Sequence, residues 1–446
     1  MQTDESLSEL FEFLRFPSIS TDPVHATAVS DCAHWLVRKL SQMGLEASAH
    51  PTPGHPVVLA RSPHQPGRPT VLIYGHYDVQ PVDPLELWEQ NPFEPFIRNG
   101  RIIARGSTDN KGQILAHIFG VRQTLAENGS LPVNLIFLIE GEEEIGSPNL
   151  GPFLEQHRKE LACDIVAISD TGMVAAGLPT FTYSLRGIAA LEVFLHGPDK
   201  DLHSGIYGGA VANPVTELCR LIATLHNTQG RVAVPGFYDG VRELQPAERA
   251  AWSGLPLNDT TLLELTGSPV LAGETGYSAL ERTWARPTAE LNGINGGYQG
   301  EGTKTVLPAK ASAKLTFRLV PDQDPAYVIE RVSRHLKQHC PPGVRMELQA
   351  GHSGKPYLID PDCNYGRAAR RALARAFGGI EPALIREGGS IPIVSSFRDI
   401  LGADTLLLGL ALPDCRAHSP NENFPVENFI AGQKLNRELL RELSVI

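Results

Sequence analysis

Histidine and acidic residues follow predicted strands at several places in this sequence. His76 and Asp78 come directly after the apolar run Val71–Tyr74 and Gly75, which predicts a short strand buried on both faces. In open α/β sheets, sites lie just beyond the carboxyl ends of such strands. A lone His-x-Asp pair is common in ordinary polar loops, so this pair needs support from the rest of the chain. A metal site is the leading hypothesis.

Two further segments place carboxylates at the ends of predicted elements. RGSTDNKG puts Asp109 directly before a predicted helix, where an aspartate is also a preferred N-cap. EGEEEIGS puts Glu142, Glu143 and Glu144 after the strand predicted over 133–139, where such a run is also compatible with a solvated acidic face. Each segment taken alone leaves both interpretations open.

Asp170 follows the strand predicted over 165–168, and His418 follows the strand predicted near 404–410. A turn aspartate and a hydrogen-bonded loop histidine are the ordinary alternatives. Adjacent carboxylates repel one another unless a counter-charge is present, and a divalent cation supplies one. Two imidazoles and three carboxylates suit zinc, and manganese or cobalt is also chemically acceptable.

Eight motifs together resemble one known family. GHYDVQP, RGSTDNKG, EGEEEIGS, the Ser169–Asp170 pair, KDLHSGIYGG, RLVP, REGGS and AHSPNE resemble the co-catalytic zinc aminoacylase/carboxypeptidase/dipeptidase family, and most closely its carnosinase and cytosolic nonspecific dipeptidase branch. The motifs run from residue 75 to 423 in the family's order and so cover almost the whole chain. The resemblance implies a hydrolase that cleaves the amide bond of dipeptides or similar small substrates with a free carboxylate.

The resemblance also implies a ligand set for two zinc ions per subunit. His76, Asp109 and Asp170 resemble the ligands around one ion, with Asp109 bridging to the other. Glu144 and His418 resemble the remaining protein ligands of the second ion. Two such ions share a water molecule and lower its pKa toward neutrality.

Supporting roles are implied in the same way. Asp78 resembles the carboxylate that orients a metal-bound imidazole, and Glu143 resembles the general base that passes a proton from water to the leaving amine. Spacing alone does not choose between Glu143 and Glu144. Glu142 is left outside the site, as a solvated or supporting residue. The family also implies a cis peptide bond at Asp109–Asn110.

A second group of candidates would bind the substrate. His203, in a Gly-rich segment, resembles the residue that stabilises the oxyanion from the partner subunit of a homodimer. Arg318 resembles the residue that holds the substrate carboxylate, to which a guanidinium can donate two parallel hydrogen bonds. Either residue alone is also compatible with an ordinary surface position. Weaker candidates for substrate contacts are Gly389, Ser390, Asn213 and Thr305.

The elements that must position these residues form two domains. Strand and helix alternate over 1–185, which predicts an α/β catalytic domain with a mainly parallel sheet. The order βαββαβ over 186–356 predicts an inserted ferredoxin-like α+β domain that serves as a lid or in dimerisation. The α/β pattern resumes over 357–446, so the catalytic domain is discontinuous. Residues 228–290, rich in proline and glycine, predict an irregular insertion in the second domain.

Length, charge and cysteine usage agree with a soluble enzyme. A chain of 446 residues exceeds the usual size of one hydrophobic core. The net charge of −11 argues against nucleic-acid partners and anionic membranes. Six cysteines without a CxxC pair fit a reducing compartment, and the sequence shows neither a signal peptide nor a spanning segment, so we expect a cytoplasmic protein.

Two other functions remain open at this stage. The same pair of metal ions would also serve a hydrolase of N-acyl amino acids, so the substrate is either a small peptide or an N-acyl amino acid. The third hypothesis is a non-catalytic zinc-binding or peptide-binding protein that keeps the scaffold of an enzyme.

Overall fold

The computed structural model describes residues 2–446, which fold as two compact units. The first unit comprises the residues up to Tyr183, Ile359–Ile385 and Ser396–Ile446, and the second comprises Ser184–Leu358 and Arg386–Ser395. The domain boundaries predicted near residues 185 and 356 lie close to the boundaries between these units. Arg386–Ser395 was predicted in the catalytic domain, but it belongs to the second unit, because its loop hydrogen-bonds to arginines of that unit.

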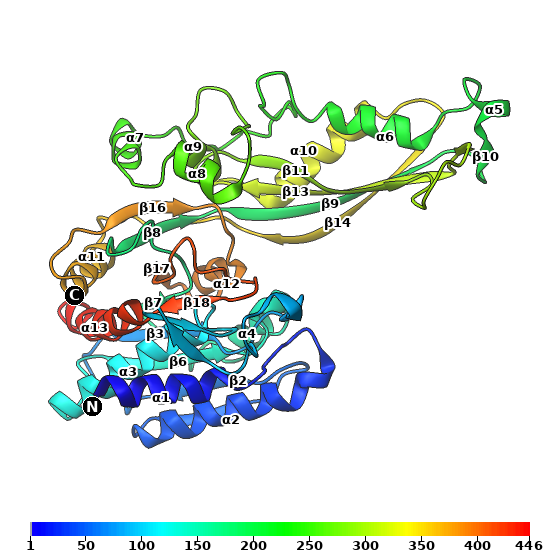
Figure 1. The fold of residues 1–446 in the computed structure, drawn as a ribbon. Helices are drawn as coiled ribbons and strands as arrows, with labels where there is room; N and C mark the ends of the chain where they lie inside the picture. Colours follow the sequence, from blue (N-terminus) through cyan, green and yellow to red (C-terminus); the bar gives the residue numbers. More distant parts are fainter. Residues whose placement is uncertain (1) are drawn as a thin grey trace. The chain divides into compact units, whose positions relative to one another are not determined.

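The first unit is built on a mixed sheet with the strand order β1-β2-β6-β3-β7-β17-β8 (Figure 1). The central strands β6, β3, β7 and β17 are parallel, whereas β1, β2 and β8 pair antiparallel at the edges. The predicted sheet is therefore parallel in its centre only. The strands are β1 (Glu46–His50), β2 (Val57–Arg61), β3 (Thr70–His76), β6 (Asn134–Glu140), β7 (Ile165–Ile168), β8 (Thr180–Leu185) and β17 (Asp404–Leu407).

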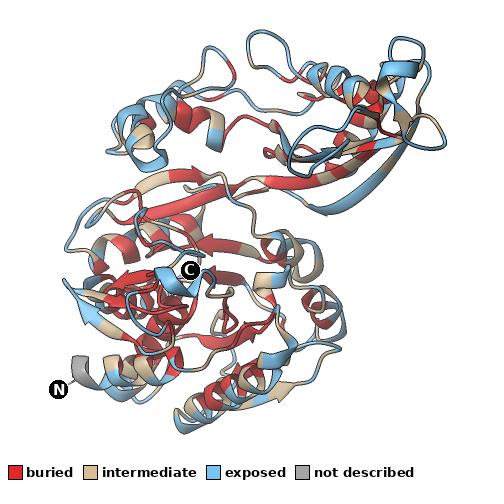
Figure 2. Ribbon diagram, turned by 45° about the vertical axis from the view of Figure 1, so that its right-hand side comes forward, coloured by how far each residue is buried: buried red, intermediate tan, exposed pale blue. Residues whose placement is uncertain are grey.

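Helices pack on this sheet through their apolar stripes. Helix α3 is buried along most of its length because it packs against α1, α13 and strand β3. The central strands are also buried on both faces, which explains their continuous apolar runs (Figure 2). The helices are α1 (Gln2–Leu14), α2 (Ala26–Gln42), α3 (Lys111–Asn128), α4 (Leu150–Gln156), α11 (Asn364–Ala376) and α13 (Val426–Leu443).

Shorter elements connect these layers. Strands β18, β5 and β4 form a small antiparallel sheet that fixes the segment after His418. The single turn η3 follows β6 and carries two of the candidate glutamates. These elements are β4 (Phe96–Arg98), β5 (Arg101–Ile103), β18 (Asn423–Pro425), η1 (Pro23–His25), η2 (Leu85–Leu87), η3 (Glu143–Ile145), η4 (Phe397–Leu401), α12 (Pro392–Ser396) and β16 (Ala383–Glu387).

The second unit is a ferredoxin-like sandwich, as its βαββαβ order predicts. Its main sheet is antiparallel in the order β11-β13-β9-β14, and helices α6 and α10 complete a core of its own around Leu315, Phe317 and Leu336. The elements are β9 (Gly187–His196), α6 (Pro214–Ala223), β11 (Thr288–Gly296), β13 (Lys310–Leu319), α10 (Pro325–Gln338), β14 (Arg345–Gly354), β10 (Leu202–His203), α5 (Ser204–Tyr207), β12 (Val306–Leu307) and β15 (Tyr357–Leu358).

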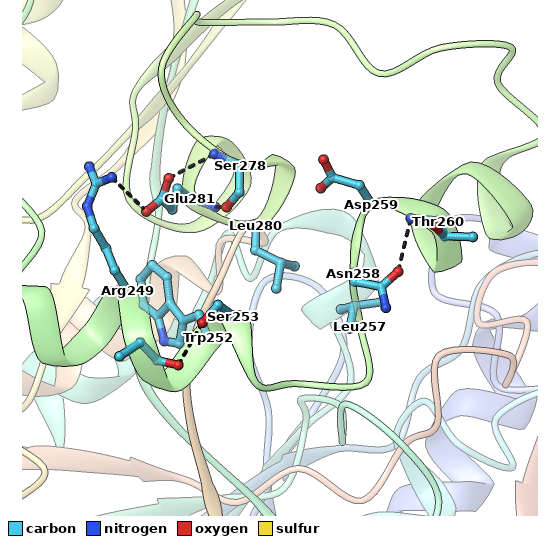
Figure 3. Close-up of a pocket in the computed structure, with 11 residues that line it drawn as sticks. Arg249, Trp252, Ser253, Leu257, Asn258, Asp259, Thr260, Ser278, Leu280 and Glu281 are labelled. Carbon is cyan, nitrogen blue, oxygen red and sulfur yellow. Dashed lines mark hydrogen bonds and ion pairs between the residues drawn. The ribbon is translucent and has the colours of Figure 1, made fainter.

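The insertion over 228–290 is not irregular throughout, contrary to the prediction. It contains the short helices α7 (Pro246–Ser253), α8 (Asp259–Thr266) and α9 (Ala279–Trp284). Local caps define them: the Asn258 side chain accepts from the first turn of α8, and Ser278 with Glu281 forms a capping box on α9. These helices enclose a cavity of about 620 Å³ (Figure 3).

Within residues 2–446, no helix combines the length and the apolar character that crossing a membrane requires.

Candidate metal centre

The candidate ligands meet because neighbouring strands end at the same edge of the sheet. Strands β6, β3 and β7 are parallel and in register, with Tyr74 opposite Leu138 on one side and Ile168 on the other. The segments that follow these strands therefore leave the sheet together. His76 is the last residue of β3, and the segments after β6 and β7 carry Glu144 and Asp170 a few residues beyond their strands. Parallel pairing thus explains why residues far apart in the sequence lie side by side.

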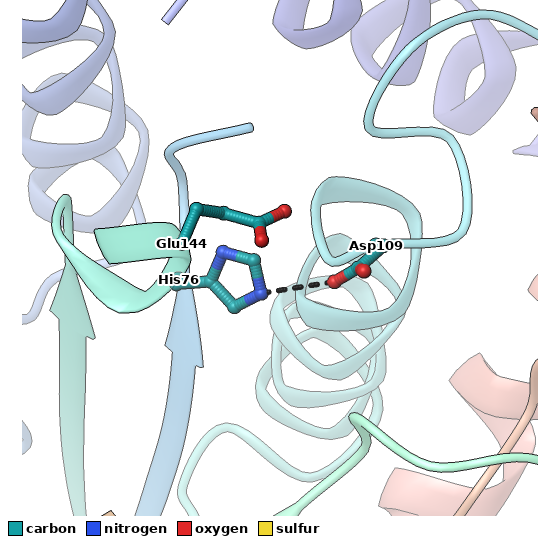
Figure 4. A group of neighbouring side chains, drawn as sticks. All are labelled: His76, Asp109 and Glu144. Atoms are coloured by element: carbon teal, nitrogen blue, oxygen red, sulfur yellow. Dashed lines mark hydrogen bonds and ion pairs between the residues drawn. The ribbon is translucent and has the colours of Figure 1, made fainter. Parts of the chain in front are cut away.

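Asp109 lies between two imidazoles. Its Oδ1 is 3.1 Å from His76 Nε2 and its Oδ2 is 2.8 Å from His418 Nε2. In Figure 4 the carboxylate of Asp109, from the loop before α3, points at the ring of His76 from β3, with Glu144 beside them. A carboxylate that offers one oxygen to each of two imidazole-bearing sites has the geometry of a bridging ligand.

Glu144 and Asp170 extend this arrangement on opposite sides. Glu144 Oε2 is 3.3 Å from His418 Nε2, and Asp170 Oδ1 is 3.8 Å from His76 Nε2. The amide of Asn110 donates to Asp170 Oδ1 at 2.8 Å and so fixes that carboxylate. All five predicted ligands therefore converge, with Asp170 on the His76 side and Glu144 on the His418 side, the distribution that the family resemblance implies.

The residues present fit a metal ion. One ligand atom each from His76, Asp109 and Glu144 lies within 4.8 Å of the others. Glu144 Oε1 is buried and has no hydrogen-bond partner among the described residues, which is costly unless a cation completes its shell. Imidazole nitrogens with carboxylate oxygens are a donor set that zinc accepts readily.

Burial and mutual repulsion favour the protonated form of several side chains in this cluster. Burial is the main cause that raises the pKa values of Glu143, Glu144 and Asp170, and the neighbouring carboxylates add to it. Hydrogen bonds to Asp109 and Glu144 raise the pKa of His418 to about 10. For Asp109, hydrogen bonds from both histidines outweigh burial and lower the pKa. A bound cation would take the place of the protons on such a cluster.

Asp78 supports both the histidine and the glutamate turn. Its carboxylate is fully buried, and Oδ1 lies 3.3 Å from His76 Nδ1, while the Asp78 backbone carbonyl lies 3.1 Å from the same nitrogen. The role of Asp78 in orienting a metal-bound ring stays a prediction. The same carboxylate accepts hydrogen bonds from the backbone N–H groups of Glu143 at 3.2 Å and Glu144 at 3.1 Å. One side chain thus fixes His76 and the turn η3 together.

Glu142 was predicted to be a solvated or a supporting residue, and the prediction that it is solvated is wrong. The side chain is buried and its carboxylate accepts from the backbone N–H of His55 at 3.1 Å and from Asn149 Nδ2 at 2.8 Å. It ties two loops together behind the turn η3. Its position agrees with a supporting residue outside the ligand set.

Glu422, which no sequence pattern marked as a site residue, holds the loop that carries Asp109. Its buried carboxylate accepts from Arg105 Nη1 at 2.8 Å and from the backbone N–H groups of Gly106, Thr108 and Asp109 at 2.9, 2.9 and 3.0 Å. The peptide bond Asp109–Asn110 in this loop is cis, as the family resemblance implies. Glu422 lies in the AHSPNE motif, but only the fold shows what it contacts.

The predicted substrate-binding residues belong to the second unit, whereas the metal ligands belong to the first. Arg318 Nη1 donates to Ser390 Oγ at 2.9 Å, which joins two of these candidates, and Gly389 precedes Ser390 in the same loop. A Cβ added at Gly389 would meet no heavy atom of the described residues within 4 Å, its two chain neighbours aside. Their roles toward substrate remain predictions.

The remaining candidates lie around strand β10. His203 pairs with Val306, next to Thr305, and its Nδ1 accepts from the backbone N–H of Gly205 at 3.0 Å. The carbonyl of Thr305 accepts from Ser204 N at 3.0 Å. Asn213 is instead the N-cap of α6, and its side chain accepts from the first turn of that helix. The Asn213 side chain therefore stabilises the start of α6, whether or not it also contacts substrate.

Known proteins resemble this chain in fold and in sequence. The model of peptidase family M20/M25/M40 matches residues 72–442. The chain belongs to this family. The Cys-Gly metallodipeptidase dug1 of Schizosaccharomyces pombe is 33% identical over 463 residues, which cover 99% of this chain and 96% of that protein.

Two solved structures agree with this assignment. The structure of human carnosine dipeptidase 1 is 30% identical and superposes with a TM-score of 0.84, covering 100% of this chain and 97% of that one. The M20 family metallo-carboxypeptidase Sso-CP2 of Sulfolobus solfataricus is 35% identical with a TM-score of 0.88, covering 99% and 100%. The predicted family branch and fold class are confirmed.

Proposed function

We propose that the protein is a metal-dependent dipeptidase that cleaves the amide bond of small peptides with a free carboxylate. The observation that carries this proposal is the Asp109 carboxylate between His76 and His418, flanked by Glu144 and Asp170. The relatives named above, a Cys-Gly metallodipeptidase and a carnosine dipeptidase, support the substrate class.

Two divalent cations, zinc by preference, would be held by the five converging side chains. His76 and Asp170 would bind one ion, Glu144 and His418 the other, and Asp109 both. The cations would supply Lewis acidity toward the scissile carbonyl and toward an attacking water molecule. Manganese and cobalt accept the same donors, so the native metal has to be measured.

Glu143 would move the proton. Its backbone N–H is tied to Asp78, next to the tied N–H of Glu144, so the turn η3 presents two adjacent carboxylates from a fixed backbone. Glu144 Oε2 lies 3.3 Å from His418 Nε2, which suits a ligand of the same ion. Glu143 would then be the carboxylate that takes a proton from water and delivers it to the leaving amine.

The second unit would hold the substrate. Arg318 would bind the free carboxylate through its guanidinium, supported by Ser390, and the amides near Gly389 would contact the same end of the substrate. His203 would stabilise the oxyanion from the partner subunit of a homodimer. Thr305 lies beside this loop, and Asn213 would contribute by fixing the end of α6.

A Glu143→Gln variant tests the proposed base. Turnover of a dipeptide should fall by several orders of magnitude, because the amide cannot accept the proton, while the metal content stays unchanged. Metal analysis and steady-state kinetics measure both quantities. Glu155→Gln, at an exposed position of α4, is the matched control and should behave as wild type. Near-normal turnover in Glu143→Gln would remove this residue from the role of base.

Removal of the metal tests the centre itself. Dialysis against a chelator should abolish hydrolysis, and zinc should restore it with a stoichiometry near two ions per chain. Activity that survives complete removal of the metal would contradict the proposal.

A substrate panel separates the proposed activity from its alternatives. Sso-CP2 is named a carboxypeptidase, so longer peptides belong in the panel beside dipeptides and acetylated or carbamoylated amino acids. We expect the highest kcat/KM for dipeptides. Preference for the acylated amino acids would favour a deacylase, and no turnover of any substrate would favour a binding protein.

A further inference from the structure

A cavity in the second unit carries an excess of positive charge. It has a volume of about 440 Å³, within the range of small-molecule sites. Its walls come partly from the insertion over 228–290 and partly from the strands of the ferredoxin-like sheet. Among the described residues that line it are four arginines and two glutamates, so two positive charges have no match. The charged residues are Arg186, Arg282, Arg286, Arg318, Glu274 and Glu290.

Two of the four arginines already have partners within the wall. Arg286 forms two hydrogen bonds of 2.8 Å with the carboxylate of Glu274. Arg231 donates a third hydrogen bond to the same carboxylate, so both oxygens of Glu274 are already bound to arginines. Arg282 donates to the backbone carbonyls of Glu274 and Ala272 at 3.0 and 2.9 Å. These two arginines therefore hold the insertion in place and are not available to a ligand.

Arg186 and Arg318 each donate one side-chain hydrogen bond within the described residues, fewer than Arg282 or Arg286. Among the described residues, neither forms an ion pair; Arg186 Nε donates to the Gly388 carbonyl at 3.0 Å, and Arg318 Nη1 donates to Ser390 Oγ at 2.9 Å. Burial and the charge of Arg318 lower the pKa of Arg186 to about 10, although Glu290 acts in the opposite direction. Glu290 is the only carboxylate of the described lining that Arg286 does not use, so these two guanidiniums keep an excess of positive charge that a bound anion would offset.

Both guanidiniums are attached to the same loop. Ser390 Oγ donates to the backbone carbonyl of Arg186 at 2.6 Å while it accepts from Arg318, and the backbone N–H of Arg186 donates to the Glu387 carbonyl at 3.2 Å. These contacts fix the spacing of the two arginines before any ligand arrives. Preorganised donors of this kind bind an anion without the cost of ordering long side chains.

We propose that Arg186 and Arg318 form a site for two carboxylates, which gives the enzyme a preference for peptides whose carboxyl-terminal residue is acidic. This inference rests on the proposed dipeptidase function, in which Arg318 holds the terminal carboxylate. Arg186 then binds the carboxylate of the side chain within the cavity. An acidic carboxyl-terminal residue carries two negative charges, the number that the lining leaves unmatched. The insertion over 228–290 then has a role in substrate binding, because its residues form part of the wall of this cavity.

The test compares Ala-Glu with Ala-Gln, which are nearly isosteric and differ in one charge. In the wild-type enzyme, kcat/KM for Ala-Glu should exceed that for Ala-Gln by roughly ten-fold or more, the value of a charge-assisted hydrogen bond. The difference should lie mainly in KM, because the side-chain contact is the same in the ground state and the transition state. Equal values for the two substrates in the wild type would overturn the proposal.

Variants test whether Arg186 causes the preference for an acidic carboxyl-terminal residue. In Arg186→Leu the ratio of the two kcat/KM values should fall to near one, and in Arg186→Lys it should be intermediate. Arg282→Gln removes one positive charge from the same cavity at a partnered position and should keep the ratio. A ratio that falls equally in Arg282→Gln, or that survives in Arg186→Leu, would overturn the assignment. Hydrolysis of the neutral Ala-Leu tests the dipeptidase function separately.

Discussion

Glu422 shows how one buried carboxylate can position the proposed ligand Asp109 from outside the proposed ligand set. Its carboxylate accepts hydrogen bonds from the Arg105 side chain and from three backbone N–H groups of the loop that carries Asp109. Burial raises its pKa, and the charge of Arg105 opposes this effect. The loop conformation that places Asp109 between two histidines therefore depends on a residue from a distant part of the chain.

We expect Glu422→Gln to weaken the metal centre and the fold together. The variant leaves Arg105 buried without its counter-charge, which costs about 3–5 kcal/mol of unfolding free energy. Metal affinity should fall by roughly 10- to 100-fold, because the loop that carries Asp109 is less well fixed. Chemical denaturation and competition with a chelator measure the two effects. Glu427→Gln, at an exposed position on α13, is the control; wild-type affinity in Glu422→Gln would contradict this role.

The sequence predicted those site residues that directly follow recognisable strands. His76 and Asp170 come after apolar runs, so their placement followed from the parallel sheet. The choice between Glu143 and Glu144 did not follow from spacing, because both lie in one irregular turn. Glu142 was misjudged for a similar reason: a run of acidic residues resembles a solvated face, and only the packing shows that His55 and Asn149 bury it.

Among the elements, α3 and α13 are joined by a buried histidine. His117 of α3 accepts from Asn436 Nδ2 of α13 at 2.8 Å and donates to Ser169 Oγ at 2.7 Å. Burial lowers the pKa of His117 to about 4. The neutral ring fits the two partners, because one nitrogen accepts and the other donates.

This histidine should make stability depend on pH between about 4 and 6.5. In that window the unfolded chain binds a proton that the folded protein does not, so stability is full above pH 6.5 and is lost as the pH falls toward 4. The loss should amount to about 3 kcal/mol. Denaturation curves at several pH values should show a smaller slope for His117→Gln than for wild type. His64→Gln, at an exposed position, should keep the slope; an unchanged slope in His117→Gln would contradict the expectation.

Long elements were predicted closely, and short ones were not. Strands β3 and β6 carry continuous apolar runs, and their ends lie within two residues of those predicted. The insertion helices have fewer residues than the pattern needs, and prolines and glycines flank them. The antiparallel edges of the sheet also escaped prediction, because strand direction is set by the connections and not by the strand residues themselves.

At the scale of the whole molecule, each unit has its own hydrophobic core. The core of the second unit lies between its sheet and the helices α6 and α10. Proteins with two such cores often unfold in more than one step. The metal centre belongs to one unit only, so damage to the other core should leave metal binding intact.

A Leu336→Ala variant tests this independence. Leu336 is fully buried in α10, and its truncation should destabilise the second unit by about 2–5 kcal/mol. Hydrogen exchange should show faster opening of β9 and β13, while zinc affinity measured with a competing chelator stays at the wild-type value. Leu265→Ala, at a position that is 50% exposed, controls for the loss of methyl groups at the surface. A parallel fall in zinc affinity would show that the cores are coupled.

Strand β17 lies between β7 and β8, although it comes from the last part of the chain. During synthesis on the ribosome, the second unit's sheet is complete while the first unit still lacks a central strand. His418, a proposed metal ligand, emerges later still. We therefore expect nascent chains to acquire zinc only at the end of translation, and cells starved of the ion to accumulate finished polypeptide that awaits loading.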